Sequence, residues 1–182
     1  MRDYFQEQLN ELNRELTIMG SSCEEIIALA SQALTNWDEE LVQKVNTIGA
    51  QIDESERTIE TICMKLLLRQ QPVARDLRQI SAAMKMITDM ERIGDQAEDI
   101  VEIVPYMNAH PDEKYPKIRE MAKAAQAMVT EAVDAYVKQD LNLARKVMSH
   151  MMWWMIILPG SKKVSSILLQ QNPPRANMRW IC

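Results

Sequence analysis

A group of acidic residues in the middle of the chain has the types and spacing of metal ligands. Glu91, Asp95 and Asp99 follow one another at intervals of four residues, and Glu98 and Glu102 repeat that interval. On a helix such residues share a face, and each like-charged pair costs roughly 0.2–0.5 kcal/mol. A bound cation would turn this cost into a gain. Because the donors are oxygens with no His or Cys nearby, the pattern indicates Mg²⁺, Mn²⁺, Ca²⁺ or iron rather than copper or structural zinc.

The residues alone leave a second interpretation open, which is a solvated acidic stripe on a helix surface. In both interpretations a helix must hold the acids.

Apolar and small residues recur at alternating steps of three and four, the pattern of helices that pack along a seam. The seams run through residues 9–33, 41–66, 80–104 and 118–135. Met and Cys residues on these seams are expected to fill the core.

The ends of these helices carry their own signals. Asp38 and Asp140 are expected N-caps of the second and fifth helices, since a carboxylate there accepts a backbone N–H. Pro72 ends the second helix, because the residue before a proline disfavours helical geometry. Gly94 lies in the third seam, where its missing side chain is expected to let a neighbouring helix approach. Long helices with short connections predict an all-α fold built as an antiparallel bundle.

An internal repeat divides the chain. Met19 is followed 102 residues later by Met121, and at the same offset Asp38 corresponds to Asp140 and Leu41 to Leu143. We therefore expect a complete three-helix unit in residues 1–104, a linker in 105–116, and the first part of a second unit in 117–150. The fourth and fifth helices lack a third partner, so we expect them to be looser or to pair with another chain as a homodimer.

Residues 151–182 do not fit this design. All 26 acids precede residue 151, and the final segment holds four basic residues and three of the four Trp. Met and Trp have single codons, so the run from Met151 to Met155 back-translates almost uniquely. Read one base earlier, positions 152–156 become Asp-Val-Val-Asp-Asp, and their last three residues match Ile52, Asp53 and Glu54 at the repeat offset. We expect a frameshifted tail. The alternative is a chance match, since degenerate codons allow many readings, and a separate interpretation of the tail is a basic arm for a membrane or nucleic acid.

Composition narrows the class of protein. The net charge of −5 argues against a nucleic-acid binder. The 3 Cys are odd in number and show no CxxC spacing, which favours a reducing compartment. The polar N-terminal residues predict no signal peptide, and no apolar run is long enough for direct membrane insertion.

Two segments resemble a known family. Residues 90–97, Met-Glu-Arg-Ile-Gly-Asp-Gln-Ala, are similar to the L-E-R-I-G-D-H-A motif of PhoU, the bacterial phosphate-uptake regulator. Residues 69–78 are similar to that family's turn before its third helix. The resemblance covers about residues 10–150. It implies tandem three-helix bundles, the first complete and the second incomplete, and a cytoplasmic accessory protein. Such proteins quiet phosphate-starvation signalling by linking the ATPase of the phosphate transporter to a phosphate-sensor histidine kinase.

The resemblance also implies metal ions held by E(D)xxxD motifs. Glu91 and Asp95 form the complete motif of the third helix, with Gln96 in place of the usual His. In the motif of the second helix Asp53 is present, but Gly49 replaces the first acid. The seam places Asp53 and Glu91 on the flanks of neighbouring helices, one residue after a core position each. We expect Glu91, Asp95, Asp53 and Asp99 to bind Mg²⁺, Mn²⁺ or a ferric ion, with Gly49 weakening the site.

Three classes of function remain for comparison. The first is a PhoU-like metal-binding adaptor, which is not an enzyme, and the second is a non-functional or purely structural helical fragment. The third, a di-iron carboxylate enzyme, requires Glu-x-x-His. The only His residues, His110 and His150, have Met107 and Val147 three positions earlier. That mismatch disfavours the di-iron class.

Overall fold

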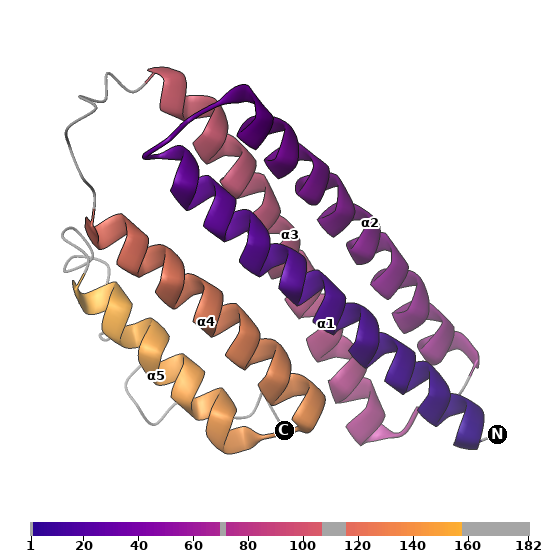
Figure 1. Ribbon diagram of the computed structural model, residues 1–182. Helices are drawn as coiled ribbons and strands as arrows, with labels where there is room; N and C mark the ends of the chain where they lie inside the picture. Colours follow the sequence, from indigo (N-terminus) through magenta and orange to yellow (C-terminus); the bar gives the residue numbers. More distant parts are fainter. Residues whose placement is uncertain (1, 70–71, 107–115, 158–182) are drawn as a thin grey trace.

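The computed structural model describes residues 2–69, 72–106 and 116–157, and within those ranges every regular element is a helix. Figure 1 shows the helices lying side by side along one direction. Their bounds are α1 Arg2–Ala33, α2 Glu39–Arg69, α3 Ala74–Ile103, the short 3₁₀ turn η1 Val104–Tyr106, α4 Pro116–Lys138 and α5 Leu141–Ile157. The prediction of an all-α fold is confirmed.

The helices α1, α2 and α3 pack against one another and share one apolar core. Each expected seam position of α1 and α3 is buried, and in α2 only Ser55 is not fully enclosed. Leu16, Ile52 and Ile80 have no exposed surface at all. Full burial of a Leu or Ile side chain contributes about 1.5–3 kcal/mol. The heptad pattern therefore predicted most of the core of this three-helix bundle, but it left out Cys63, which is fully buried beside the expected seam of α2.

The helix ends are fixed by the residues that were expected to cap them. The Asp38 carboxylate accepts a hydrogen bond from the Leu41 backbone N–H at 2.7 Å. Asp140 accepts two such bonds at the start of α5, from Asn142 at 2.9 Å and Leu143 at 3.1 Å. Both caps satisfy N–H groups that have no partner inside the helix. The capping predictions are confirmed.

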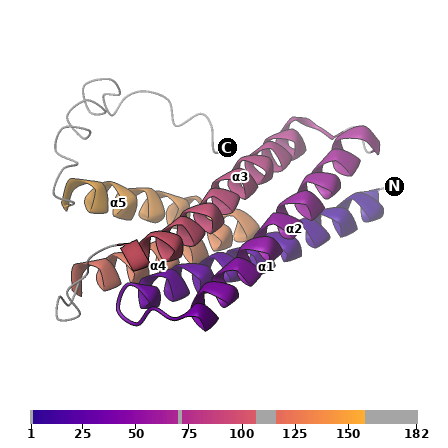
Figure 2. The ribbon, with the colours of Figure 1, turned by 90° about the horizontal axis from the view of Figure 1, so that it is seen from above.

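The helix α4 packs along α1, and α5 packs on α4 (Figures 1 and 2). The helices α1 and α4 come close at Gly20 of α1, where an added Cβ would lie 3.0 Å from Cγ2 of Val133 on α4. The Gln126 side-chain amide donates to the Glu24 carbonyl at 2.9 Å, and the Tyr136 hydroxyl donates to the Gln79 carbonyl of α3 at 3.0 Å. These contacts join α4 to the three-helix bundle.

The expected seam of α4 is only partly right. Of its positions, Ala135 is buried, whereas Ile118, Met121 and Met128 remain partly exposed. The best-buried large side chain of α4 is instead Val133, which packs into the core of the three-helix bundle. The physical reason is that α4 lies between α1 and α5 and therefore needs two packing faces, and a one-face seam cannot predict both.

The expectation for Gly94 is wrong. An added Cβ there would lie 3.5 Å from Ile52 Cδ1, which is an ordinary van der Waals contact. The helices α2 and α3 would therefore keep their spacing with an alanine at this position.

Part of the off-pattern tail is helical, since α5 continues to Ile157. Residues 158–182 lie outside the described residues, so the frameshift stays a prediction. None of the described helices combines the length and apolar character needed to cross a bilayer.

Candidate functional site

The candidate site is a row of carboxylates along the contact between α2 and α3. We call it the acidic ridge, and it consists of Asp53 and Glu56 from α2 and Glu91, Asp95 and Glu98 from α3. Asp53 and Glu91 each follow a buried residue, Ile52 and Met90 respectively. Burial of these two apolar residues turns the neighbouring carboxylates to the edge of the helix contact. The heptad argument gave the same placement.

The charges of the acidic ridge act on one another across the two helices. The pKa of Glu91 is raised by partial burial and then by the charges of Asp95 and Asp53. Partial burial also raises the pKa of Glu56, with contributions from Glu91, Glu60 and Asp53. Asp53 of α2 thus lies close enough to α3 to disfavour ionisation there. Such mutual repulsion is what a bound cation relieves.

Glu98 is a member of the acidic ridge that the sequence interpretation missed as a site residue. Its pKa is raised by burial first and then by Asp53, Asp95, Glu102 and Asp99. An added Cβ at Gly49 would overlap Glu98 Oε1 and would lie 2.7 Å from Glu98 Cδ. The Glu98 carboxyl group therefore occupies the space beside Gly49, where an acid was expected from the motif.

A sequence signal for Glu98 existed. It lies seven residues after Glu91, and residues seven apart return to the same side of a helix. Glu56 likewise lies three residues after Asp53. Neither residue belongs to the E(D)xxxD motif, whose fixed spacing selects Glu91 and Asp95 on α3 and Asp53 on α2.

Asp99 takes a different place from the other predicted ligands. Its side chain is exposed, and among Glu56, Glu91 and Glu98 its charge contributes to the pKa shift of Glu98 alone. The structure thus brings Asp53, Glu91 and Asp95 to one helix contact and leaves Asp99 farther along α3.

The donor chemistry suits a hard cation, since the acidic ridge offers carboxylate oxygens. Its geometry is more open than that of a preformed site. In the part of the chain that the structure describes, no three His, Cys, Asp or Glu side chains converge on one point. Arg92 offsets a part of the repulsion on Glu91, and it also lies 3.9 Å from Asp89. A cation would have to draw the carboxylates together.

Comparisons with known proteins agree on one family. Residues 16–104 match the family model described as the PhoU domain. A phosphate-specific transport system accessory protein PhoU homolog from Clostridium acetobutylicum is 35% identical over 148 residues, which are 80% of this chain and 68% of that protein. A homolog of the same description from Pseudomonas aeruginosa is 34% identical, over 79% of this chain and 60% of its own length. Against the second relative, the match therefore spans less than two thirds of the full-length protein.

A solved structure shows the same arrangement of helices. The crystal structure of PhoU from Pseudomonas aeruginosa superposes with a TM-score of 0.74 at 29% sequence identity. The superposition covers 93% of this chain and 82% of that chain.

Proposed function

Because the chain belongs to the PhoU family, we propose that it is an accessory regulator of phosphate-specific transport. The observation that carries the proposal is the 35% identity to a transport accessory protein over 80% of the chain. The structural match to a PhoU protein over 93% of the chain supports the same conclusion. The relatives are named as accessory proteins, in keeping with the expectation that this chain is not an enzyme.

We propose further that the protein acts in the cytoplasm and lowers phosphate-starvation signalling. In this role it would contact the ATPase of the phosphate transporter and the phosphate-sensor histidine kinase. The support is the family membership together with the accessory role in the relatives' names.

Complementation tests this role. The gene is returned to a bacterial strain that lacks its own PhoU protein, and phosphate uptake and a phosphate-starvation reporter are measured in phosphate-rich medium. Restored repression of the reporter supports the regulator. An unchanged reporter, with the protein present at normal levels, would favour the alternative of a non-functional or structural helical fragment. The matched control is the C. acetobutylicum relative expressed from the same promoter.

We also propose that the acidic ridge binds a divalent or ferric ion. Asp53, Glu91 and Asp95 would hold it, with Asp99 as an outer ligand. Glu98 would supply the carboxylate that Gly49 does not. The support is the position of the Glu98 carboxyl group beside Gly49 and the repulsion among the carboxylates of α2 and α3.

Calorimetric titration with Mn²⁺ and Mg²⁺ tests the metal proposal. Glu91→Gln combined with Asp95→Asn should abolish binding, and Glu98→Gln should weaken it. The control is Glu7→Gln combined with Glu25→Gln, which removes two exposed carboxylates of α1. The variant Gly49→Asp restores the acid that the motif expects, but the new side chain must displace the Glu98 carboxyl group. It should therefore tighten metal binding by less than a carboxylate added in open space would. If the wild type and the Glu91/Asp95 double variant bind Mn²⁺ and Mg²⁺ with equal affinity, the acidic ridge is only a solvated acidic stripe and not a metal site.

A homodimer is the last part of the proposal. The helix α5 exposes Met148, Met151 and Met152, each at 45–50% of its surface. Apolar side chains repeated on one helix are a common contact between chains. Light scattering coupled to size-exclusion chromatography should give a molar mass twice that of the 21.0 kDa chain. The change Met148→Glu should return the protein to monomer, whereas Thr47→Glu on the exposed face of α2 should not.

A further inference from the structure

The helix α5 carries three exposed methionine side chains close together. Met148 is 45% exposed, Met151 48% and Met152 50%. Their backbone positions span four helical steps, which is about 6 Å along the helix axis. Leu141, which is 44% exposed, lies seven residues before Met148 and eleven before Met152, so these three residues share one side of α5. We call Met148, Met151 and Met152 together the methionine face.

Other sulfur groups of the molecule are shielded from solvent. Met19 has no exposed surface, and Met90 is only 5% exposed. Cys23 and Cys63 are buried as well, and burial raises the pKa of their thiols to about 12 and about 11 respectively. Because the thiolate is the form that reacts with oxidants, both thiols are inert at neutral pH. An oxidant in solution therefore meets the methionine face well before it meets these four groups.

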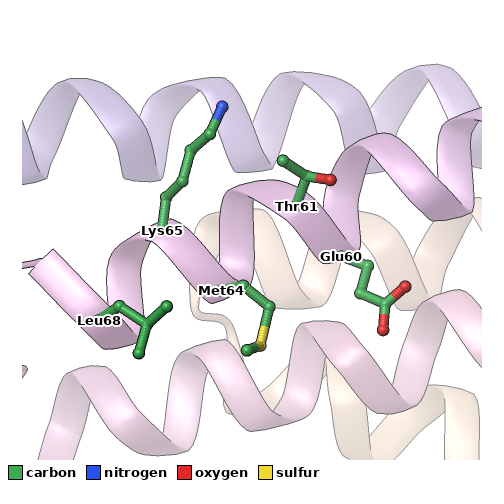
Figure 3. Close-up of a pocket in the computed structure, with 5 residues that line it drawn as sticks. All are labelled: Glu60, Thr61, Met64, Lys65 and Leu68. Atoms are coloured by element: carbon green, nitrogen blue, oxygen red, sulfur yellow. The ribbon is translucent and has the colours of Figure 1, made fainter.

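Met64 on α2 offers a comparison within the same molecule. It is 43% exposed, which is close to the exposure of the methionine face. Figure 3 shows its thioether in the shallow hollow of α2, where the other lining residues are Glu60, Thr61, Lys65 and Leu68. None of these neighbours is a methionine. Met64 thus has an accessible sulfur of the same kind without a cluster around it.

We propose that the methionine face is an oxidation site, at which peroxides convert the three thioethers to sulfoxides and thereby separate the two chains of the proposed homodimer. The effect on the two chains rests on that homodimer, in which the exposed Met side chains of α5 form the contact. The oxidation itself rests on the exposure of the three sulfur atoms and on their clustering.

The chemistry needs hydrogen peroxide or another peroxide as its co-reactant. A lone pair of the thioether sulfur attacks one peroxide oxygen, a sulfur–oxygen bond forms and the oxygen–oxygen bond breaks. The proton of the attacked oxygen passes to the departing oxygen, which leaves as water. The sulfur loses two electrons and the peroxide gains them, so one hydrogen peroxide yields one sulfoxide and one water. Each reaction turns a flexible apolar side chain into a polar one.

A sulfoxide in the contact between two chains opposes their association. Its oxygen would lose its hydrogen bonds to water without gaining a partner in an apolar contact. Covering the exposed half of one Met side chain favours association by about three- to tenfold. Loss of this gain at all three positions should weaken the dimer by at least about 30-fold.

Peroxide treatment of the full chain tests the proposal. Cys182 is changed to Ser in every protein, because an intermolecular disulfide would mimic a dimer. Mass spectrometry of peptides follows sulfoxide formation over time, and light scattering coupled to size-exclusion chromatography gives the molar mass. Sulfoxides should form at the methionine face and at Met64 while Met19 and Met90 stay reduced, and the dimer should become a monomer. Methionine sulfoxide reductases with a thiol reductant should restore the dimer.

Three variants separate oxidation of the methionine face from other effects of peroxide. Replacing its three residues by Leu keeps the volume and apolar character, so this variant should dimerise and resist peroxide. Replacing them by Gln places polar groups on the same face, so this variant should be monomeric without any oxidant. Met64→Leu removes the matched exposed sulfur and should respond to peroxide as the wild type does. Circular dichroism should show equal helix content in all of them.

The two parts of the proposal fail in different ways. Sulfoxide that forms at Met19 and Met90 as fast as at the methionine face would overturn the oxidation site. A dimer that persists after all three residues are oxidised would overturn the effect on the two chains. A monomeric untreated protein would overturn the homodimer together with that effect, whereas selective sulfoxide formation in such a monomer would still support the oxidation site.

Discussion

The three-helix bundle α1–α3 and the helix pair α4–α5 differ in how their helices are packed, although α4 carries the same kind of apolar seam as the bundle helices. In the bundle α1, α2 and α3 each contact the other two, and their seam residues are almost all buried. In the pair, α5 packs on α4, and its Met residues remain half exposed. The difference teaches that a heptad seam specifies which face of a helix is apolar, whereas burial of that face requires neighbours that also pack against each other, as they do among α1, α2 and α3 but not around α4.

The sharpest test of this comparison is an equal truncation in each region. Ile52→Ala in the enclosed core should lower the free energy of unfolding by about 2–5 kcal/mol, because it leaves a cavity. Met128→Ala, at a half-buried seam position of α4, should cost less than about 1 kcal/mol. Urea denaturation followed by circular dichroism measures both. Equal losses would show that α4 is packed as tightly as the bundle.

The contact between the two regions is tested at Gly20. The change Gly20→Ala adds a Cβ 3.0 Å from Val133 Cγ2, so the Val133 side chain on α4 must give way by a few tenths of an ångström. Such crowding costs about 1–3 kcal/mol, of which the helix preference of alanine offsets about 1 kcal/mol. Hydrogen exchange should become faster in α4 and α5 and stay slow in the middle of α2 and α3. The control Ser21→Ala changes an exposed neighbour on α1. Exchange that quickens equally in all helices would mean that the two regions unfold as one.

Inside the bundle, a substitution at Gly94 should stabilise the protein, whereas the substitutions above should destabilise it. Gly94→Ala should raise the free energy of unfolding by up to about 1 kcal/mol, because alanine favours a helix more than glycine and its Cβ finds room beside Ile52. Thermal unfolding measures the change. A destabilised variant would contradict the spacing of α2 and α3 described here.

The smallest expected effect concerns pH and the acidic ridge. The pKa values of Glu56, Glu91 and Glu98 are raised in the folded state, so the folded chain binds more protons than the unfolded one just above the ordinary glutamate range. The metal-free protein should therefore become slightly more stable as pH falls from 7 toward 5. Because these groups are partly exposed, the gain should stay well under about 1 kcal/mol.

Thermal unfolding in the presence of a chelator measures this pH dependence. Glu98→Gln should flatten it, and Glu25→Gln on α1 should not. A protein that loses stability steadily between pH 7 and 5 would show that repulsion in the acidic ridge is too weak to matter.

Sequence reasoning predicted the helices of the bundle, their caps and their core, since these depend on local spacing. It failed at α4, where Val133 lies outside the expected seam because the packing against α1 is a tertiary contact. At the candidate site it placed Asp53 and Glu91 on facing flanks. It missed Glu98, because the way a long side chain folds back over Gly49 depends on the neighbouring helix.

One hydrogen bond gives the molecule a built-in optical probe. The Trp37 indole N–H, on the turn after α1, donates to the Val101 carbonyl at 3.1 Å. That carbonyl lies in the last turn of α3, where helical carbonyls lack a partner within the helix. The ring is 41% exposed, so its fluorescence emission will move to longer wavelength when α3 frays from the turn. With Trp153, Trp154 and Trp180 replaced by Phe, Trp37 alone would report on the end of the bundle where the turn after α1 meets the last turn of α3.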